Sequence, residues 1–237
     1  MEAKDLIGHI SGSRVLDVAT GNGGFIHFML EGLKDFDEII GIDTKEGLEE
    51  VFEEQFGDKP IRYQQMDAAQ MEFADESFDT VCISNSLHHM PDLPRTLSEM
   101  LRVLRPGGHL ILLEMYRDNQ SETQITHVQL HHWWGAVDRV QGISHNETFR
   151  REEIIEMAAG LGLVEMRVHD LSELGENPRD PSILAEINPV IDRYIQRADG
   201  HPELQARGEE LRQHLEDVGL DGAASLLVTG KKGNVEA

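Results

Sequence analysis

Short β-rich runs alternate with segments of helical periodicity through the first half of this chain, and this alternation constrains its fold more than any other feature. Five runs have the length, the β-branched residues and the flanking turn residues of strands; they are RVLDV (14–18), EIIGI (38–42), IRYQQ (61–65), FDTVCI (78–83) and HLILLE (109–114). Between them, apolar residues recur with the period of an amphipathic helix, as Phe25, Met29 and Leu33 do. Because such units need right-handed crossovers, we expect a doubly wound α/β fold with a mostly parallel sheet.

The second half of the chain contributes further helices and two more strands. The polar segment 117–147 is interpreted as an inserted helix. Thr148 is expected to be the N-cap of the next helix, with Gly162 ending it, and VEMRVHD (164–170) then predicts a strand. SLLVTGK (225–231) predicts the last strand, which we place in the main sheet to make seven strands.

A helical insertion is expected before that last strand, over 171–222. Three of its segments open with a proline, namely Asp180-Pro181, Asn188-Pro189 and His201-Pro202. Proline suits the first helical position, because the N–H group that it lacks would have no helical partner there. We treat 1–237 as a single domain in which this insertion is a candidate lid.

The composition narrows the classes of function. The 237 residues include 21 Lys and Arg against 44 Asp and Glu, a net charge of −23, and so many carboxylates repel the phosphates of nucleic acid. Apolar runs such as LILL (110–113) fall far short of the about 20 residues that a membrane span needs. The polar opening MEAKDLIGHI does not resemble a signal peptide, which predicts a cytoplasmic protein. The single cysteine, Cys82, excludes an intrachain disulfide and a Cys-rich metal site.

A glycine-rich turn, LDVATGNGG (16–24), follows the first predicted strand and runs directly into a helix. Glycines let a ligand approach the backbone, and the helix N-terminus offers free N–H groups, so the turn is a candidate binding site. A dinucleotide fingerprint would need a third glycine at position 26, where Ile26 stands. This departure disfavours an oxidoreductase that uses nicotinamide or flavin.

Acidic residues end the next two predicted strands. Asp43 lies 22 residues beyond Gly21, where a carboxylate can accept both hydroxyl groups of a ribose. Asp67 follows the third strand and can accept a hydrogen bond from an adenine amino group. Because the carboxyl ends of parallel strands meet at one edge of the sheet, the three strand ends predict a site for an adenosine-bearing cofactor.

These residues belong to five motifs, namely VLDVATGNGG (15–24), GID (41–43), QMDA (65–68), SFDTVCISNSLHHMPD (77–92) and LRVLRPGGHLILLE (101–114). With them the sequence resembles class I S-adenosylmethionine-dependent methyltransferases, in particular the small-molecule group that includes the C-methyltransferases of ubiquinone and menaquinone biosynthesis. The resemblance covers residues 14–116, and the usual G-C-G of the first motif reads Ala19-Thr20-Gly21 here. It implies a Rossmann-like methyltransferase fold, and S-adenosylmethionine as cofactor.

The resemblance also implies a role for each matching residue. The implied cofactor-binding residues are Ala19, Gly21 and Gly23 in the glycine-rich turn, Asp43 and Thr44 at the ribose, Asp67 and Ala68 at the adenine, and Ser84 beside the amino acid moiety. The implied reaction moves the cofactor's methyl group to a small-molecule acceptor by in-line displacement. Alignment of donor and acceptor can supply about 7–11 kcal/mol of the barrier, so a strong general base is optional.

The histidine pair His88-His89 follows the fourth predicted strand, at the edge that faces the cofactor. His131 lies in the inserted segment beside two tryptophans, in a position that walls the substrate pocket in this architecture. An unperturbed histidine has a pKa of about 6.5, so it can accept a proton near neutral pH. We therefore predict that His131, with His88, faces the acceptor and takes or orients its proton.

His127 and His131 are four residues apart and therefore share one helical face. Such a pair suits either a metal site or the wall of a substrate pocket. A metal would need a third ligand close in space, such as His145 or Glu122. We favour the pocket wall and expect no metal.

Two other classes of function are kept beside the enzyme. The first is a cofactor-binding scaffold or regulator that has the methyltransferase-like fold and no turnover. The second is the nucleotide-dependent oxidoreductase that Ile26 disfavours. Acceptors that are methylated on carbon, oxygen, nitrogen or sulfur all remain open, and so does a homodimer.

Overall fold

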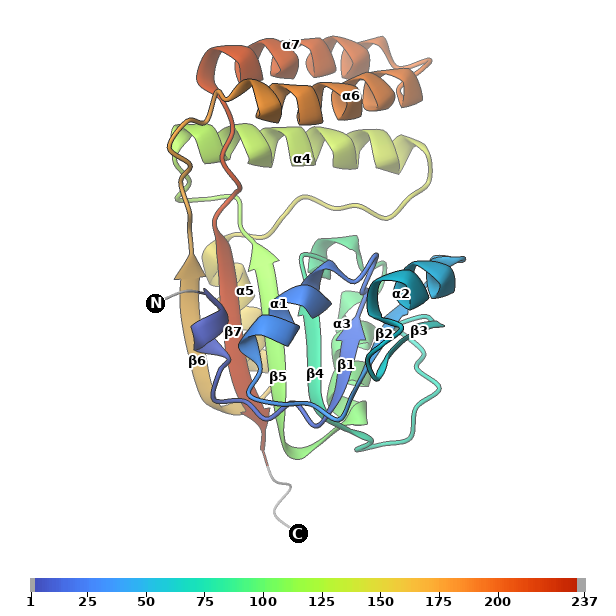
Figure 1. The fold of residues 1–237 in the computed structure, drawn as a ribbon. Coiled ribbons are helices and arrows are strands. Elements are labelled where there is room, and N and C mark those ends of the chain that lie inside the picture. Colours follow the sequence, from blue (N-terminus) through green and yellow to red (C-terminus); the bar gives the residue numbers. More distant parts are fainter. Residues whose placement is uncertain (1–2, 234–237) are drawn as a thin grey trace.

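The computed structural model describes residues 3–233, in which seven strands form one sheet (Figure 1). The strands are β1 (Arg14–Val18), β2 (Glu38–Asp43), β3 (Ile61–Gln65), β4 (Phe78–Ser84), β5 (Leu104–Met115), β6 (Leu163–Leu171) and β7 (Ser225–Lys232). Their order is β3-β2-β1-β4-β5-β7-β6, and β7 runs antiparallel to the other six strands. The predicted doubly wound, mostly parallel sheet of seven strands is confirmed.

Helices cover both faces of this sheet. The helical elements are η1 (Ala3–Leu6), α1 (Gly24–Gly32), α2 (Leu48–Phe56), η2 (Leu87–His89), α3 (Leu93–Val103), α4 (Glu122–Val140), α5 (Arg151–Gly160), α6 (Pro181–Arg197) and α7 (Pro202–Val218). Apolar residues of α1 and α2 pack on one face, and those of α3 and α5 pack on the other. The strands therefore have both faces buried, which explains their nearly continuous apolar character.

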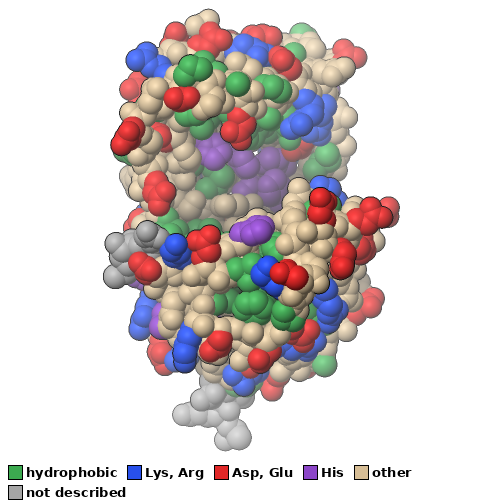
Figure 2. Space-filling model, viewed as in Figure 1, with side chains coloured by type: hydrophobic (Ala, Val, Ile, Leu, Met, Phe, Trp, Pro, Cys, Tyr) green, Lys and Arg blue, Asp and Glu red, His purple; other side chains and the backbone are tan. Residues whose placement is uncertain are grey.

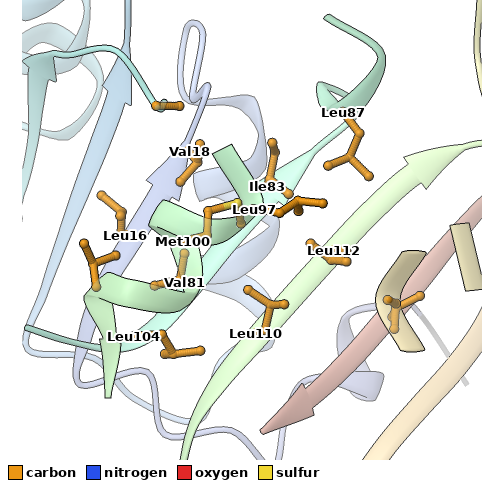
Figure 3. Packing of buried hydrophobic residues seen from close by; sticks show 14 of the residues in the cluster. Leu16, Val18, Val81, Ile83, Leu87, Leu97, Met100, Leu104, Leu110 and Leu112 are labelled. Atoms are coloured by element: carbon orange, nitrogen blue, oxygen red, sulfur yellow. The ribbon is translucent and has the colours of Figure 1, made fainter. Parts of the chain in front are cut away.

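Neighbouring residues of β1 show how the two cores are separated. Leu16 and Val18 point into the core that contains α3, whereas Val15 points into the core that contains α1. Figure 3 shows Leu16 and Val18 beside Met100 of α3, with the apolar side chains of β4 and β5 continuing the same layer. This alternation follows from the two-residue period of a strand.

Helices α4, α6 and α7 form a separate layer above the carboxyl edge of the parallel strands (Figure 1). Their shared core consists of Leu130, Trp133, Val137, Ile191, Ala198, Leu211 and Leu215. The Trp133 indole also donates a hydrogen bond to the Leu204 carbonyl at 2.8 Å. The predicted insertion before the last strand therefore packs on the inserted helix α4. Among the helices of residues 3–233, none has the length and apolar character needed to cross a membrane.

Two local predictions are wrong. Pro189 does not open a helix but lies inside α6, where burial of Ile191 against the other helices offsets the cost of about 3 kcal/mol for an interior proline. Thr148 is not the N-cap of α5, which has Arg150 in that place. The buried Thr148 hydroxyl instead lies 2.9 Å from His132 Nε2, so a tertiary contact replaces the local cap.

Candidate functional site

A pocket of about 710 Å³ opens at the carboxyl edge of β1 to β4, within the range of about 300–1,000 Å³ typical of small-molecule sites. Residues that follow these four strands form most of it, and the loop after α4 closes one side. The lining residues are Ala19, Gly21, Ile42, Asp43, Thr44, Met66, Asp67, Ala68, Ala69, Asn85, Ser86, His89, Met90, Pro91, Asp92, Thr96, Ile143 and Ser144. Strand ends that are distant in sequence thus meet around one cavity.

Six of the eight residues predicted to bind the cofactor line this pocket, namely Ala19, Gly21, Asp43, Thr44, Asp67 and Ala68. Gly23 does not line it and serves the fold instead: it has φ 82° at the start of α1, and a Cβ there would lie 2.7 Å from the Phe56 ring. Ser84 is the last residue of β4, next to the lining residues Asn85 and Ser86.

The turn after β1 is held by a buried carboxylate. Asp17 is fully buried and accepts a hydrogen bond of 2.6 Å from the Thr20 hydroxyl, while Ala19 and Gly21 both adopt positive φ. Burial raises the pKa of Asp17 to about 6, against the lowering effect of its hydrogen bonds from Thr20 and Cys82. Asp17 is not among the lining residues, so it supports the turn.

The Asp43 carboxylate is oriented by two backbone amides. Its Oδ2 accepts a hydrogen bond from Gly21 at 3.0 Å, and its Oδ1 accepts one from Lys45 at 3.1 Å. Each carboxylate oxygen has a second lone pair, so both remain able to accept from hydroxyl groups of a ligand. Asp67 is held in a similar way, because its Oδ1 accepts a hydrogen bond from the Ala69 amide at 2.8 Å.

Histidines gather beside this pocket, in the hollow between the helical layer and the sheet (Figure 2). His131 Nε2 on α4 lies 2.9 Å from His88 Nε2 and 3.1 Å from His145 Nε2. The neighbouring His89 lines the pocket itself. The structure thus brings together the predicted pair His88 and His131, and it adds His89 and His145. Sequence reasoning had named His145 as a third ligand for a metal, and His89 only as a neighbour of His88.

His127 does not join this cluster. Its Nδ1 accepts a hydrogen bond from the Ala223 amide at 2.8 Å, so the pair of His127 and His131 considered for a metal is not formed. Burial, and then the neighbouring histidines, lower the pKa of His131 to about 2. A histidine that binds a proton so weakly is a poor general base near neutral pH, which weakens the prediction that His131 takes a proton from the acceptor.

Residues 16–112 match the family model described as a methyltransferase domain. The match confirms the resemblance to class I methyltransferases that the five motifs indicate. Demethylmenaquinone methyltransferase of Bacteroides fragilis is 36% identical over 107 residues, which cover 43% of this chain and 43% of that protein. The matched part therefore spans less than half the length of that relative.

The whole chain also resembles solved structures in fold. YcgJ of Bacillus subtilis has a TM-score of 0.60 and 20% identity, and the match covers 98% of this chain and 97% of that one. The [4+2]-cyclase SpnF has a TM-score of 0.63 and 19% identity, with 98% and 80% of the two chains covered. At such identities the likeness shows the fold, including the helical layer outside residues 16–112.

Proposed function

We propose that this protein transfers the methyl group of S-adenosylmethionine to a small-molecule acceptor. The observation that carries the proposal is the convergence of six predicted cofactor-binding residues from three strand ends on one pocket of about 710 Å³. Asp43 is then the ribose-binding residue, because both of its oxygens retain a free lone pair. Asp67 and Ala68 meet the adenine, while Ala19 and Gly21 line the methionine part.

When bound, the cofactor would supply an electrophilic methyl group on a sulfonium, which an acceptor would take in line as S-adenosylhomocysteine leaves. The protein's own part is to align the two reactants and to exclude water. Ile143 and Ser144 bring the loop after α4 to the pocket, whereas no residue of 171–222 lines it. We therefore place the acceptor between the cofactor and α4. Helices α6 and α7 pack on the outer side of α4, so they contribute to the lid by supporting α4 and not by contacting the acceptor.

The experiment that tests this function measures transfer of a tritiated methyl group from S-adenosylmethionine to pooled small metabolites, with calorimetric binding of S-adenosylhomocysteine in parallel. Incorporation into a small molecule supports the proposal. Binding without incorporation would instead favour the cofactor-binding scaffold, because one fold supports many activities. A rise of melting temperature with NADH and none with S-adenosylhomocysteine would favour the oxidoreductase.

The small-molecule acceptor is favoured by the likeness to a demethylmenaquinone methyltransferase and by the size of the pocket. A net charge of −23 further opposes binding to nucleic acid. The cytoplasmic location and the homodimer stay predictions. Sedimentation of the purified chain measures the oligomer directly.

A further inference from the structure

The histidine cluster brings ring nitrogens from three imidazoles close together. His131 Nε2 lies 2.9 Å from His88 Nε2 and 3.1 Å from His145 Nε2. With His89, the cluster offers four ligand atoms that all lie within 4.8 Å of one another. Each of the four residues is buried or half-buried, so water competes little for these nitrogens.

Carboxylates determine which nitrogens carry protons in this cluster. His88 Nδ1 lies 2.7 Å from Glu114 Oε1, and His145 Nδ1 lies 2.7 Å from Asp138 Oδ2. An ionised carboxylate can only accept hydrogen bonds, so each Nδ1 is the donor. In a neutral ring, the Nε2 of His88 and of His145 then carries no proton, and its lone pair faces His131.

The central nitrogen has too few protons for its neighbours. His131 Nε2 carries at most one proton, while the lone pairs of His88 and His145 both face it. One N–H group donates well to one acceptor only. The two lone pairs of His88 and His145 therefore meet at His131 Nε2, and neither nitrogen carries a proton of its own. A cation at the centre would satisfy all of them at once, whereas a proton would satisfy one pair.

The groups behind these rings follow the pattern by which proteins orient metal-binding histidines. Such histidines commonly donate their second ring nitrogen to a carboxylate or a backbone carbonyl, which fixes the tautomer. Glu114 is the accepting carboxylate for His88, and Asp138 is the accepting carboxylate for His145. Asp138 is itself held by Arg197 of α6, whose Nη2 lies 2.7 Å from Asp138 Oδ1. The 171–222 insertion thus reaches the cluster through one ion pair.

We propose that His88, His131 and His145 bind one divalent transition-metal ion of the Zn²⁺ type, with His89 as the fourth nitrogen. Nitrogens held about 2.0–2.1 Å from Zn²⁺ lie about 3.3 Å apart in a tetrahedral site, a small adjustment from the two observed spacings. A set made only of imidazoles suits Zn²⁺, Ni²⁺ or Co²⁺, whereas Mg²⁺ and Ca²⁺ prefer oxygen ligands.

This site lies beyond the proposed methyl transfer and does not depend on it. It replaces the expectation of no metal, and it assigns His88 and His131 to holding an ion in place of a proton. His89 belongs both to the cluster and to the lining of the pocket, so the ion would stand at the pocket wall.

The test measures metal binding directly, without an acceptor. The purified full-length chain is stripped with a chelator and titrated with Zn²⁺ by calorimetry, and with Co²⁺ by visible absorption. We expect one ion per chain, an intense tetrahedral Co²⁺ spectrum and no binding of Mg²⁺. His131→Gln and His145→Gln should each weaken Zn²⁺ binding at least 100-fold. Asp138→Asn should weaken it 10- to 100-fold, because it removes only the orienting carboxylate.

His127→Gln is the matched control, since His127 lies one turn from His131 on α4 and outside the cluster. Its Zn²⁺ affinity should equal that of the parent. Far-ultraviolet circular dichroism and thermal unfolding that match those of the parent show that each variant is folded, and a variant that fails this check is replaced by its alanine counterpart. Equal Zn²⁺ affinity in folded His131→Gln and parent, or several weak ions per chain, would overturn the proposal in favour of a cluster joined by hydrogen bonds alone.

Discussion

The Asp43 carboxylate accepts a hydrogen bond from the Gly21 amide at 3.0 Å, which joins the end of β2 to the turn after β1. This contact links the two parts of the pocket that the resemblance assigns to the ribose and to the methionine of the cofactor. It holds the carboxylate in place before any ligand arrives, so binding does not have to order it. Preorganisation of this kind increases affinity, because less conformational entropy is lost on binding.

Asp43→Ala should weaken the binding of S-adenosylhomocysteine about 10-fold or more, because hydrogen bonds to a charged group are worth about 1.5–3 kcal/mol. Isothermal calorimetry measures the change. Glu46→Ala is the control, since Glu46 is an exposed acid three residues away that does not line the pocket. A folded Asp43→Ala variant that binds as well as the parent would remove Asp43 from the cofactor site.

Asp17→Asn should change how stability depends on pH. The folded pKa of Asp17 is raised to about 6 from 3.8, so the folded state holds the proton more tightly and the parent loses stability as pH rises from about 4 to 6. At about 1.4 kcal/mol per pKa unit, asparagine should gain about 1 kcal/mol over the parent between pH 5 and pH 7.5. Urea unfolding at the two pH values measures this difference. If the free energy of unfolding of parent and variant changes by the same amount between the two pH values, the raised pKa of Asp17 is contradicted.

Replacement of residues 172–222 by a short Gly/Ser hairpin should leave cofactor binding nearly intact while abolishing turnover. The pocket-lining residues all lie outside this segment, but α6 and α7 bury the apolar face of α4 that carries Trp133. Without that cover, the loop after α4 should no longer exclude water. Calorimetry and the methyl-transfer assay separate the two effects. Unchanged turnover would indicate that the insertion serves another purpose, such as an oligomer interface.

Gly208→Ala should destabilise the helical layer. A Cβ at this position of α7 would clash with the Trp133 ring and lie 2.7 Å from Ile195 Cγ1. Overpacking of this kind costs about 1–3 kcal/mol, which opposes the helix propensity of alanine. Gly160→Ala is the control, because a Cβ at the end of α5 meets nothing within 4 Å. Thermal unfolding should rank Gly208→Ala below Gly160→Ala, and the reverse order would show that α7 can shift at no cost.

Local sequence patterns predict the bounds of an element well where those bounds depend only on residues within the element and at its ends. The bounds of β1 and β3 agree with the predicted 14–18 and 61–65, because side-chain alternation and turn residues act over a few positions. The start of β5 was predicted too late, at 109. Leu104 already pairs with Phe78, and the Pro-Gly-Gly that reads as a turn is a bulge within the strand.

By itself, the sequence determined the fold class and which strand-end residues line the pocket. Parallel strands bring their carboxyl ends to one edge, so motifs at those ends must converge whatever the detail of packing. Only the tertiary structure decided the histidine cluster, since His88, His131 and His145 come from η2, α4 and the loop after α4. Which faces of these elements meet depends on how the helical layer packs, and no local period encodes that. The same packing holds Pro189 inside a helix against its own preference.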